Sequence, residues 1–139
     1  MFAPNTKFLV VDDFGTMRKI IKKILSELGY TNVVEAEDGK AGLNQVQEAD
    51  KAGTPFGCVI SDWNMPNMTG LEFLKQCKAD ARLKSTPFIL VTAESEQAQI
   101  IEAAKAGVSD YVIKPFNAVT FKEKLQRTYN KHNPATKAA

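Results

Sequence analysis

The chain has few of the residues that form covalent or metal-bound cross-links. Its 139 residues include only two cysteines, Cys58 and Cys77, and one histidine. Each cysteine lies in an apolar stretch, without a Cys-x-x-Cys pair or a nearby histidine. We therefore expect buried, reduced thiols, and neither a disulfide nor a zinc site.

Long hydrophobic runs are absent too. The longest apolar stretches, such as residues 8–11 and 88–91, are far shorter than the roughly 20 residues that cross a bilayer. Residues 1–7 contain Pro4 and polar side chains, and they lack the apolar core of a secretion signal. These features predict a cytoplasmic protein without a membrane partner.

An excess of charge of one sign is also missing. The 18 lysine and arginine residues and the 16 aspartate and glutamate residues leave a net charge of +2. This small value argues against nucleic acid as a partner, because nucleic acid binding usually needs a clustered basic face. Some basic side chains do cluster between apolar positions of helical period, which favours a solvated helix face. They are Arg18, Lys19, Lys22 and Lys23.

Length and composition predict one globular domain. Hydrophobic residues make up 44% of the chain and charged residues 24%, which are ordinary values for a globular protein. A chain of this length buries the core of a single domain. We assign residues 1–131 to this domain and expect the polar segment 132–139, which contains Pro134, to be a disordered tail.

What the sequence does contain is a regular alternation of short apolar runs with amphipathic segments. The apolar runs predict five strands, at residues 8–11, 33–36, 58–60, 88–91 and 111–113. Apolar residues at helical spacing predict a helix after each strand, at about residues 17–28, 39–48, 71–77, 100–106 and from 118 onwards. Gly29 and Gly107 supply helix stops, and Asn117 is an N-cap.

Five strand–helix units predict an α/β protein with a parallel sheet and helices on both faces. Right-handed crossovers leave few topologies. Of these we expect the doubly wound, flavodoxin-like sheet with the strand order 2-1-3-4-5. In that order the first and third strands flank the switch point, where ligands bind beyond the carboxyl ends of the strands.

Polar side chains follow the strands that lie near this switch point. They are Asp12 and Asp13 after the first strand, Asp62 after the third, Thr92 after the fourth and Lys114 after the fifth. The second strand ends near Glu35, which we expect to point to solvent. Carboxylates brought together repel one another unless a cation compensates them, and a set of oxygen ligands favours Mg²⁺.

A carboxylate beside Mg²⁺ can attack a phosphoryl donor and form an aspartyl phosphate. Such a transfer needs mainly positioning and neutralisation of charge. Lys114 supplies a positive charge and Thr92 a hydroxyl donor, while Asp62 lies centrally. Each residue alone has a simpler explanation as a cap, a turn residue or a solvent-edge side chain. Their joint position at one end of consecutive strands favours a phosphoryl-transfer site.

Six motifs now point to a family: FLVVDDFGTMRK, EAEDG, VISDWNMPNMTG, VTAE, AAKAG and DYVIKPF. The likeness that these motifs carry covers the chain from residue 7 to about residue 127. The sequence resembles the receiver domain of two-component response regulators. Through WNMPNM and FGTMRK it is similar, more narrowly, to the chemotaxis response regulators of the CheY subfamily.

The resemblance implies roles for the residues at the matching positions. Asp62 would be the phosphoacceptor, and Asp13, Asp62 and the backbone carbonyl of Asn64 would be direct Mg²⁺ ligands. Asp12 would bind the metal through water. Asn64 and Glu94 lie two residues beyond Asp62 and the fourth strand's threonine, so we expect them to flank the path of the water that hydrolyses the phosphate.

The resemblance also implies a switch and an output face. Thr92 and Lys114 would bind the phosphoryl oxygens, and Tyr111 would change its rotamer as Thr92 moves toward the phosphate. The output face would run over the fourth helix, the fifth strand and the fifth helix. It would include Ala106, Tyr111 and Lys124.

In this family the expected partners are proteins. The phosphodonor would be a CheA-like histidine kinase, the output partner a FliM-like flagellar motor switch protein, and a dedicated phosphatase would reset the signal. The protein itself would be a single-domain monomer and not an enzyme with an external substrate, although it would promote its own phosphotransfer and dephosphorylation.

Two features depart from the chemotaxis pattern. The connection over residues 47–55 is longer than in close relatives, but it precedes the third strand and so lies at the sheet end opposite the site. The fourth helix begins with Glu96 and Gln97, where chemotaxis relatives often carry two lysines. This exchange changes the charge of the output face.

Other functions share the fold or the chemistry. A flavodoxin-like nucleotide binder needs a phosphate loop rich in Ser, Thr and Gly after the first strand, where this chain has Asp12 and Asp13. A phosphatase of the haloacid dehalogenase type places an Asp-x-Asp pair there, whereas these aspartates are adjacent and the candidate nucleophile lies on the third strand. A phosphorelay intermediate, which passes its phosphoryl group to another histidine, would keep the same site and change only the output.

Overall fold

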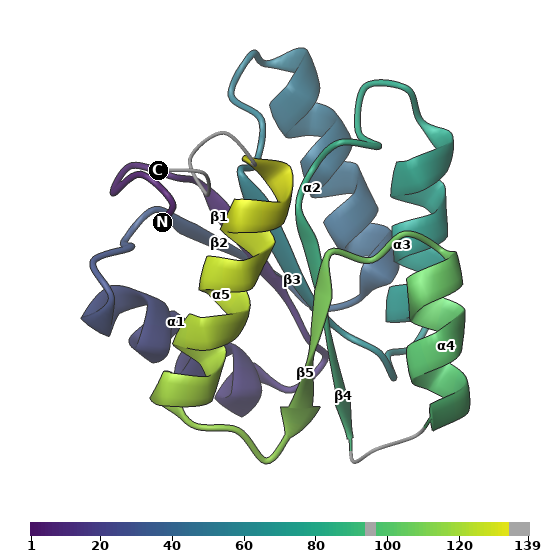
Figure 1. Ribbon diagram of the computed structural model, residues 1–139. Helices are drawn as coiled ribbons and strands as arrows, with labels where there is room; N and C mark the ends of the chain where they lie inside the picture. The colour runs from purple at the N-terminus through teal and green to yellow at the C-terminus, as the bar shows by residue number, and fades with distance from the viewer. Residues whose placement is uncertain (94–96, 134–139) are drawn as a thin grey trace.

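A computed structural model describes residues 1–93 and 97–133 of the chain. Five parallel strands form one sheet in the order β2-β1-β3-β4-β5, which confirms the expected doubly wound fold (Figure 1). The strands are β1 (Phe8–Val11), β2 (Val33–Ala36), β3 (Cys58–Asp62), β4 (Phe88–Ala93) and β5 (Asp110–Lys114).

Helices cover both faces of this sheet. They are α1 (Gly15–Glu27), α2 (Gly39–Lys51), α3 (Gly70–Ala79), α4 (Gln97–Lys105) and α5 (Ala118–His132). Helices α1 and α5 lie on one face, and α2, α3 and α4 lie on the other (Figure 1). None of the helices in the described parts of the chain has the length and hydropathy that crossing a bilayer requires.

The sheet divides the core into two layers, because successive strand residues point to opposite faces. Phe8 and Val10 of β1 pack in the layer beneath α1 and α5. Leu9 and Val11 of the same strand pack in the layer beneath α2 and α3. All four side chains are buried. The continuous apolar runs of the sequence are therefore explained by strands that are covered on both faces.

Local signals set most of the helix ends. Asn117 caps α5 by accepting the Thr120 N–H, as the sequence predicts. Asp38 caps α2 in the same way, and Thr69 forms a capping box at the start of α3. Gly29 and Gly107, the two predicted stops, have positive φ angles of 95° and 89° just beyond α1 and α4.

Three local predictions are wrong. Helix α2 continues to Lys51, so part of the supposed connection at residues 47–55 is helical. Helix α5 continues through His132, one residue into the expected tail, while residues 134–139 lie outside the described residues. Ile20, a member of the helical apolar pattern, is 45% exposed.

Both cysteines are buried free thiols, as expected.

Candidate functional site

Three carboxylates meet at the carboxyl edge of the sheet. Strands β1 and β3 are adjacent and parallel, and Val11 pairs with Ser61 in their register. The residues that follow, Asp12 and Asp13 on one side and Asp62 on the other, therefore lie side by side. One carboxylate oxygen of each lies within 4.8 Å of those of the other two. The structure thus brings together the three carboxylates that the sequence singled out.

Asp12 is the most buried of the three, with no exposed surface. Its Oδ1 accepts the Phe14 N–H at 2.9 Å. Its Oδ2 is buried without a hydrogen-bond partner among the described residues. Burial raises the pKa of the Asp12 carboxyl to about 6; the Phe14 hydrogen bond opposes this shift, and the charge of Asp62 adds to it.

Asp62 ends β3 and is only 6% exposed. Its Oδ1 accepts a hydrogen bond from Lys114 Nζ at 3.1 Å, an ion pair between residues that are 52 positions apart in the chain. Because β4 lies between β3 and β5, the lysine side chain crosses the end of β4 to reach the carboxylate. Burial raises the pKa of Asp62, and the bond from Lys114 acts in the opposite direction.

This arrangement suits a hard divalent cation. Three clustered carboxylates carry more negative charge than Lys114 compensates, and one buried oxygen of Asp12 lacks a partner among the described residues. Magnesium is typically bound by one or two carboxylates together with waters and phosphate oxygens. The acidic cluster of Asp12, Asp13 and Asp62 therefore has the donors that such an ion requires.

Thr92 lies beside this cluster but faces another partner. Asp62 pairs with Val91 in the sheet register, so Thr92 is the next residue along β4. It is 2% exposed, and its hydroxyl donates a hydrogen bond to Gln99 Oε1 at 2.9 Å. Sequence reasoning missed Gln99, since a glutamine in the first turn of a helix carries no distinctive signal. Glu94, expected to flank the water path, lies outside the described residues.

Arg18 was expected on a solvated helix face, and this expectation is wrong. Its Nε donates to Glu35 Oε1 at 3.0 Å, and another guanidinium nitrogen donates to the backbone carbonyl of Asp12 at 2.6 Å. Lys22 binds the second oxygen of Glu35. Glu35 is therefore held by α1 and does not simply point to solvent. The spacing of four between Arg18 and Lys22 was the signal that two cations share one helix face.

The predicted output residues Tyr111, Lys124 and Ala106 lie near the start of β5, in α5 and just after α4. Tyr111 is half-buried, and Lys124 Nζ lies 4.8 Å from the centre of its ring. Lys124 also pairs with buried Asp110 at 3.6 Å, as does Arg127 at 3.5 Å. Ala106 follows α4 and packs, partly buried, against the core. Sequence reasoning missed Asp110, which joins β5 to α5.

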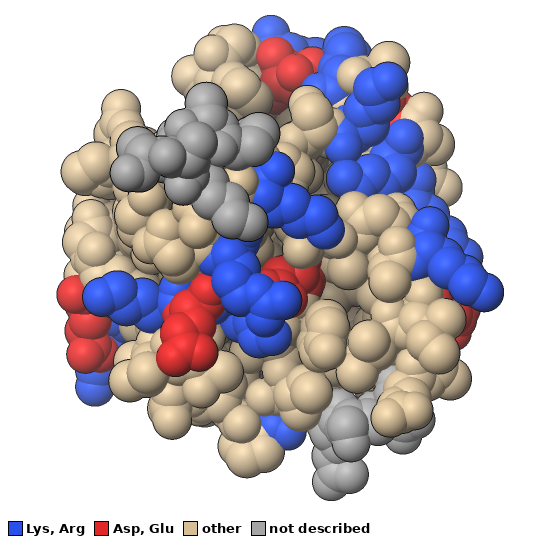
Figure 2. All heavy atoms as spheres, in the orientation of Figure 1, with Lys and Arg blue, Asp and Glu red and all other residues tan. Residues whose placement is uncertain are grey.

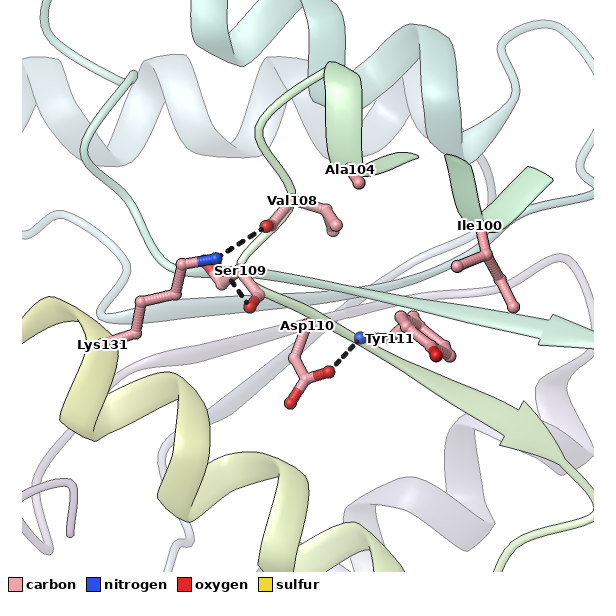
Figure 3. Close-up of a pocket in the computed structure, with 7 residues that line it drawn as sticks. All are labelled: Ile100, Ala104, Val108, Ser109, Asp110, Tyr111 and Lys131. Atoms are coloured by element: carbon pink, nitrogen blue, oxygen red, sulfur yellow. Dashed lines mark hydrogen bonds between the residues drawn. The ribbon is translucent and has the colours of Figure 1, made fainter. Parts of the chain in front are cut away.

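A small cavity opens between α4, β5 and α5 (Figure 3). Its volume is about 190 Å³. Tyr111 and Ile100 lie at one end, while Lys131 donates to the carbonyl oxygens of Val108 and Ser109 at the other end (Figure 3). The ring of Tyr111 thus borders a surface that α4 and α5 share.

Comparison with known proteins identifies the family. The sequence profile of the response regulator receiver domain matches residues 8–126, most of the chain. The chain belongs to this receiver domain family. The matched region contains the acidic cluster together with Thr92 and Lys114, so the resemblance predicted from the motifs is confirmed.

Relatives of this receiver domain include chemotaxis proteins. The chain is 47% identical over 127 residues to chemotaxis protein CheY-3 of Vibrio cholerae, covering 91% of this chain and 94% of that protein. It is 48% identical to chemotaxis protein CheY of Pseudomonas aeruginosa, covering 91% and 98%. The solved structure of the chemotaxis response regulator CheY4 of V. cholerae superposes with a TM-score of 0.79 at 35% identity, covering 89% and 98%. The protein is thus a CheY-like receiver domain.

Proposed function

We propose that this receiver domain is a phosphorylation switch that accepts a phosphoryl group on Asp62 with the help of Mg²⁺. One observation carries the proposal. Three carboxylates lie within 4.8 Å of one another, and Lys114 donates to the one that ends the central strand. A structural role alone does not account for two buried carboxylates with raised pKa values at this edge.

In the proposed reaction, a carboxylate oxygen of Asp62 attacks phosphorus while the bond from phosphorus to the donor breaks. Lys114 Nζ, already at hydrogen-bond distance from Asp62, binds a phosphoryl oxygen as negative charge arrives. Asp13, Asp62 and the Asn64 carbonyl would hold the metal directly. Asp12 would hold it through a water on Oδ2, the buried oxygen without a partner among the described residues. Bound magnesium neutralises charge on the phosphoryl oxygens.

Thr92 would turn phosphorylation into a conformational change. A phosphoryl group adds close to two negative charges, and a hydrogen bond to a charged group contributes ~1.5–3 kcal/mol. Moving an equilibrium from 1:99 to 99:1 needs about 5.5 kcal/mol. Lys114 already pairs with Asp62 before phosphorylation, so its bond to the phosphoryl group contributes only part of the free energy of a new hydrogen bond. A new bond from Thr92 would supply much of the rest and leave room for Tyr111 to turn inward.

The output surface would be the face formed by α4, β5 and α5. Lys124 and Tyr111 are in contact there, and Figure 2 shows lysine and arginine side chains gathered over α5 and near α3 and α4. A partner with acidic side chains would complement this face. Since two relatives are named chemotaxis proteins, we propose a FliM-like motor switch protein as the partner and a CheA-like histidine kinase as the donor.

Asn64 is exposed two residues after Asp62, a position that flanks the approach of water to the phosphorylated residue. A small polar side chain here would permit hydrolysis and limit the lifetime of the signal. The proposal includes Glu94 on the opposite side of this path. The protein would thus promote both its own phosphotransfer and its own dephosphorylation.

Labelling by acetyl phosphate and Mg²⁺ tests the phosphorylation site. The wild type and Asp38→Asn should gain one phosphoryl group by mass spectrometry, whereas Asp62→Asn should gain none. Asp38 follows β2 at the same edge of the sheet and caps α2, and Asn is an equally good cap, so this variant controls for the loss of one carboxylate. Stoichiometric labelling of Asp62→Asn would overturn the assignment.

A further inference from the structure

The Thr92 hydroxyl is already engaged. It donates to Gln99 Oε1 at 2.9 Å from a site with 2% exposure. Threonine has a single hydroxyl hydrogen. Thr92 therefore cannot donate to a phosphoryl oxygen on Asp62 and to Gln99 at the same time. The two acceptors compete for one donor.

The sheet geometry places the two acceptors, Gln99 and a phosphoryl group on Asp62, on opposite faces of the sheet. Residues two apart in a strand share a face, so Thr92 lies on the face of Leu90, which packs in the layer beneath α2 and α3. Asp62 lies on the face of Ile60, beneath α1 and α5. The hydroxyl is thus held toward the helices that cover the face opposite Asp62. Donation to a phosphoryl group requires it to leave Gln99.

We propose that Gln99 is a positioning residue that holds the Thr92 hydroxyl away from Asp62 and sets the free-energy cost of the switch. This inference rests on the proposed role of Thr92 as the residue that moves toward the phosphate. The Gln99 amide oxygen stabilises the unphosphorylated arrangement. Phosphorylation has to offset this bond before Thr92 turns inward.

The same bond joins the site to the output surface. Gln99 lies in the first turn of α4, directly before Ile100, and Ile100 borders the cavity that Tyr111 also lines (Figure 3). Loss of the Thr92 bond removes one link between the start of α4 and the end of β4. A change at Asp62 therefore reaches the surface between α4 and β5 by a second route, in addition to the space that Thr92 vacates for Tyr111.

Two substitutions change this bond in opposite directions. Gln99→Met keeps the length of the side chain but removes the acceptor. Gln99→Glu keeps an acceptor of the same length and makes it a carboxylate, which forms a stronger charge-assisted bond. Gln97→Met is the matched control, since Gln97 is exposed two residues earlier in the same helix.

The readout is the affinity for beryllofluoride, a phosphoryl mimic, at saturating Mg²⁺. Trp63, the only tryptophan in the sequence, follows Asp62 directly, so its fluorescence is expected to report binding. Gln99→Met should bind the mimic about five-fold more tightly, the equivalent of one ordinary hydrogen bond. Gln99→Glu should bind it more weakly, and Gln97→Met should match the wild type.

The same Gln99 variant is also made in a protein that carries Thr92→Val. This comparison distinguishes an effect of Gln99 through the Thr92 hydroxyl from a general effect of Gln99 on α4. Valine has the shape of threonine without the hydroxyl, so in this background Gln99→Met should leave the affinity unchanged. An equal gain in both backgrounds, or no gain in either, would overturn the inference. If the wild type is labelled at Asp62 while the variants behave alike, only the role of Gln99 is wrong. If the wild type is neither labelled nor bound by beryllofluoride, the proposed function fails.

Discussion

At the scale of single residues, the burial of Asp12 and Asp62 is electrostatically unfavourable, and the fold itself does not require carboxylates at these positions. Asp12 and Asp62 are buried, burial raises the pKa of each, and one Asp12 oxygen has no partner among the described residues. Buried charge is unfavourable unless it is paired or coordinates a metal. In the described part of the chain, Lys114 pairs with one of these carboxylates, Asp62. Such uncompensated charge is typical of functional sites.

Gly70 sets the close approach of α3 to this site, because a side chain there has no room. An added Cβ would overlap the carbonyl oxygen of Asp62 and lie 2.8 Å from Leu90 Cδ2. We expect Gly70→Ala to lower the free energy of unfolding by about 1–3 kcal/mol and to slow labelling of Asp62. Denaturant unfolding and acetyl phosphate labelling measure the two effects.

Gly15→Ala is the control, since its Cβ would meet nothing nearer than the flexible Arg18 side chain at 3.4 Å. It lies at the start of α1, where alanine is a better helix former than glycine. Equal stability of Gly70→Ala and Gly15→Ala would contradict the steric explanation.

At the scale of elements, long-range contacts tie helix ends to strands. Ser109, directly before β5, accepts the Phe88 N–H and bonds to His132 Nε2 at 2.7 Å. Lys131 of α5 donates to the carbonyl oxygen of Ser109. These contacts hold the last turn of α5 against the sheet, which explains why the helix continues into the segment predicted to be a tail.

The contact of His132 predicts a pH dependence. Burial and the charges of Lys78 and Lys131 lower the pKa of His132 below its ordinary value of 6.5. The unfolded chain then binds the proton more readily than the folded one, so this stabilisation is complete above pH 6.5 and is lost as the pH falls through the folded pKa. The difference in unfolding free energy between wild type and His132→Asn should therefore shrink as the pH is lowered from about 6.5 to 5.

A titration of the His132 ring by NMR checks this directly. Lys78→Met should raise the pKa toward the ordinary value, because it removes one of the neighbouring charges on α3. A folded-state pKa at or above 6.5 would show that the ring is not held neutral by its surroundings.

At the scale of the whole molecule, the acidic cluster couples metal binding to folding. The three carboxylates meet only in the folded sheet, and a ligand that binds only the folded state stabilises it by mass action. At 100 times its dissociation constant, Mg²⁺ should raise the free energy of unfolding by about 2.7 kcal/mol. Asp13→Asn should lose most of this gain, because it removes a proposed direct ligand.

Urea unfolding with and without Mg²⁺ provides the measurement, and Asp38→Asn again serves as the control. The control should keep the full gain. If Asp13→Asn keeps it as well, the metal stabilises the protein elsewhere, and the proposed ligand set is wrong.

Local sequence patterns are sufficient to predict the strands and helices, and the edge of the sheet at which the strands end. Apolar runs and helical spacing predicted every strand and helix, with errors only at ends such as those of α2 and α5. The carboxyl ends of parallel strands meet at one edge of the sheet, and this rule predicts that Asp12, Asp13 and Asp62 lie together. The metal and phosphoryl roles of these residues stay predictions.

Which side chains meet across elements depends on how the helices pack on the sheet. The bonds of Thr92 to Gln99, of Arg18 to the Asp12 carbonyl, and of Asp110 to α5 join residues of separate elements. Periodicity indicates which face of a helix is apolar, but not which polar side chain reaches a neighbouring strand. That depends on how each helix lies on the sheet and on the rotamers that packing allows. The competition for the Thr92 hydroxyl follows from such a contact and could not be predicted from the sequence.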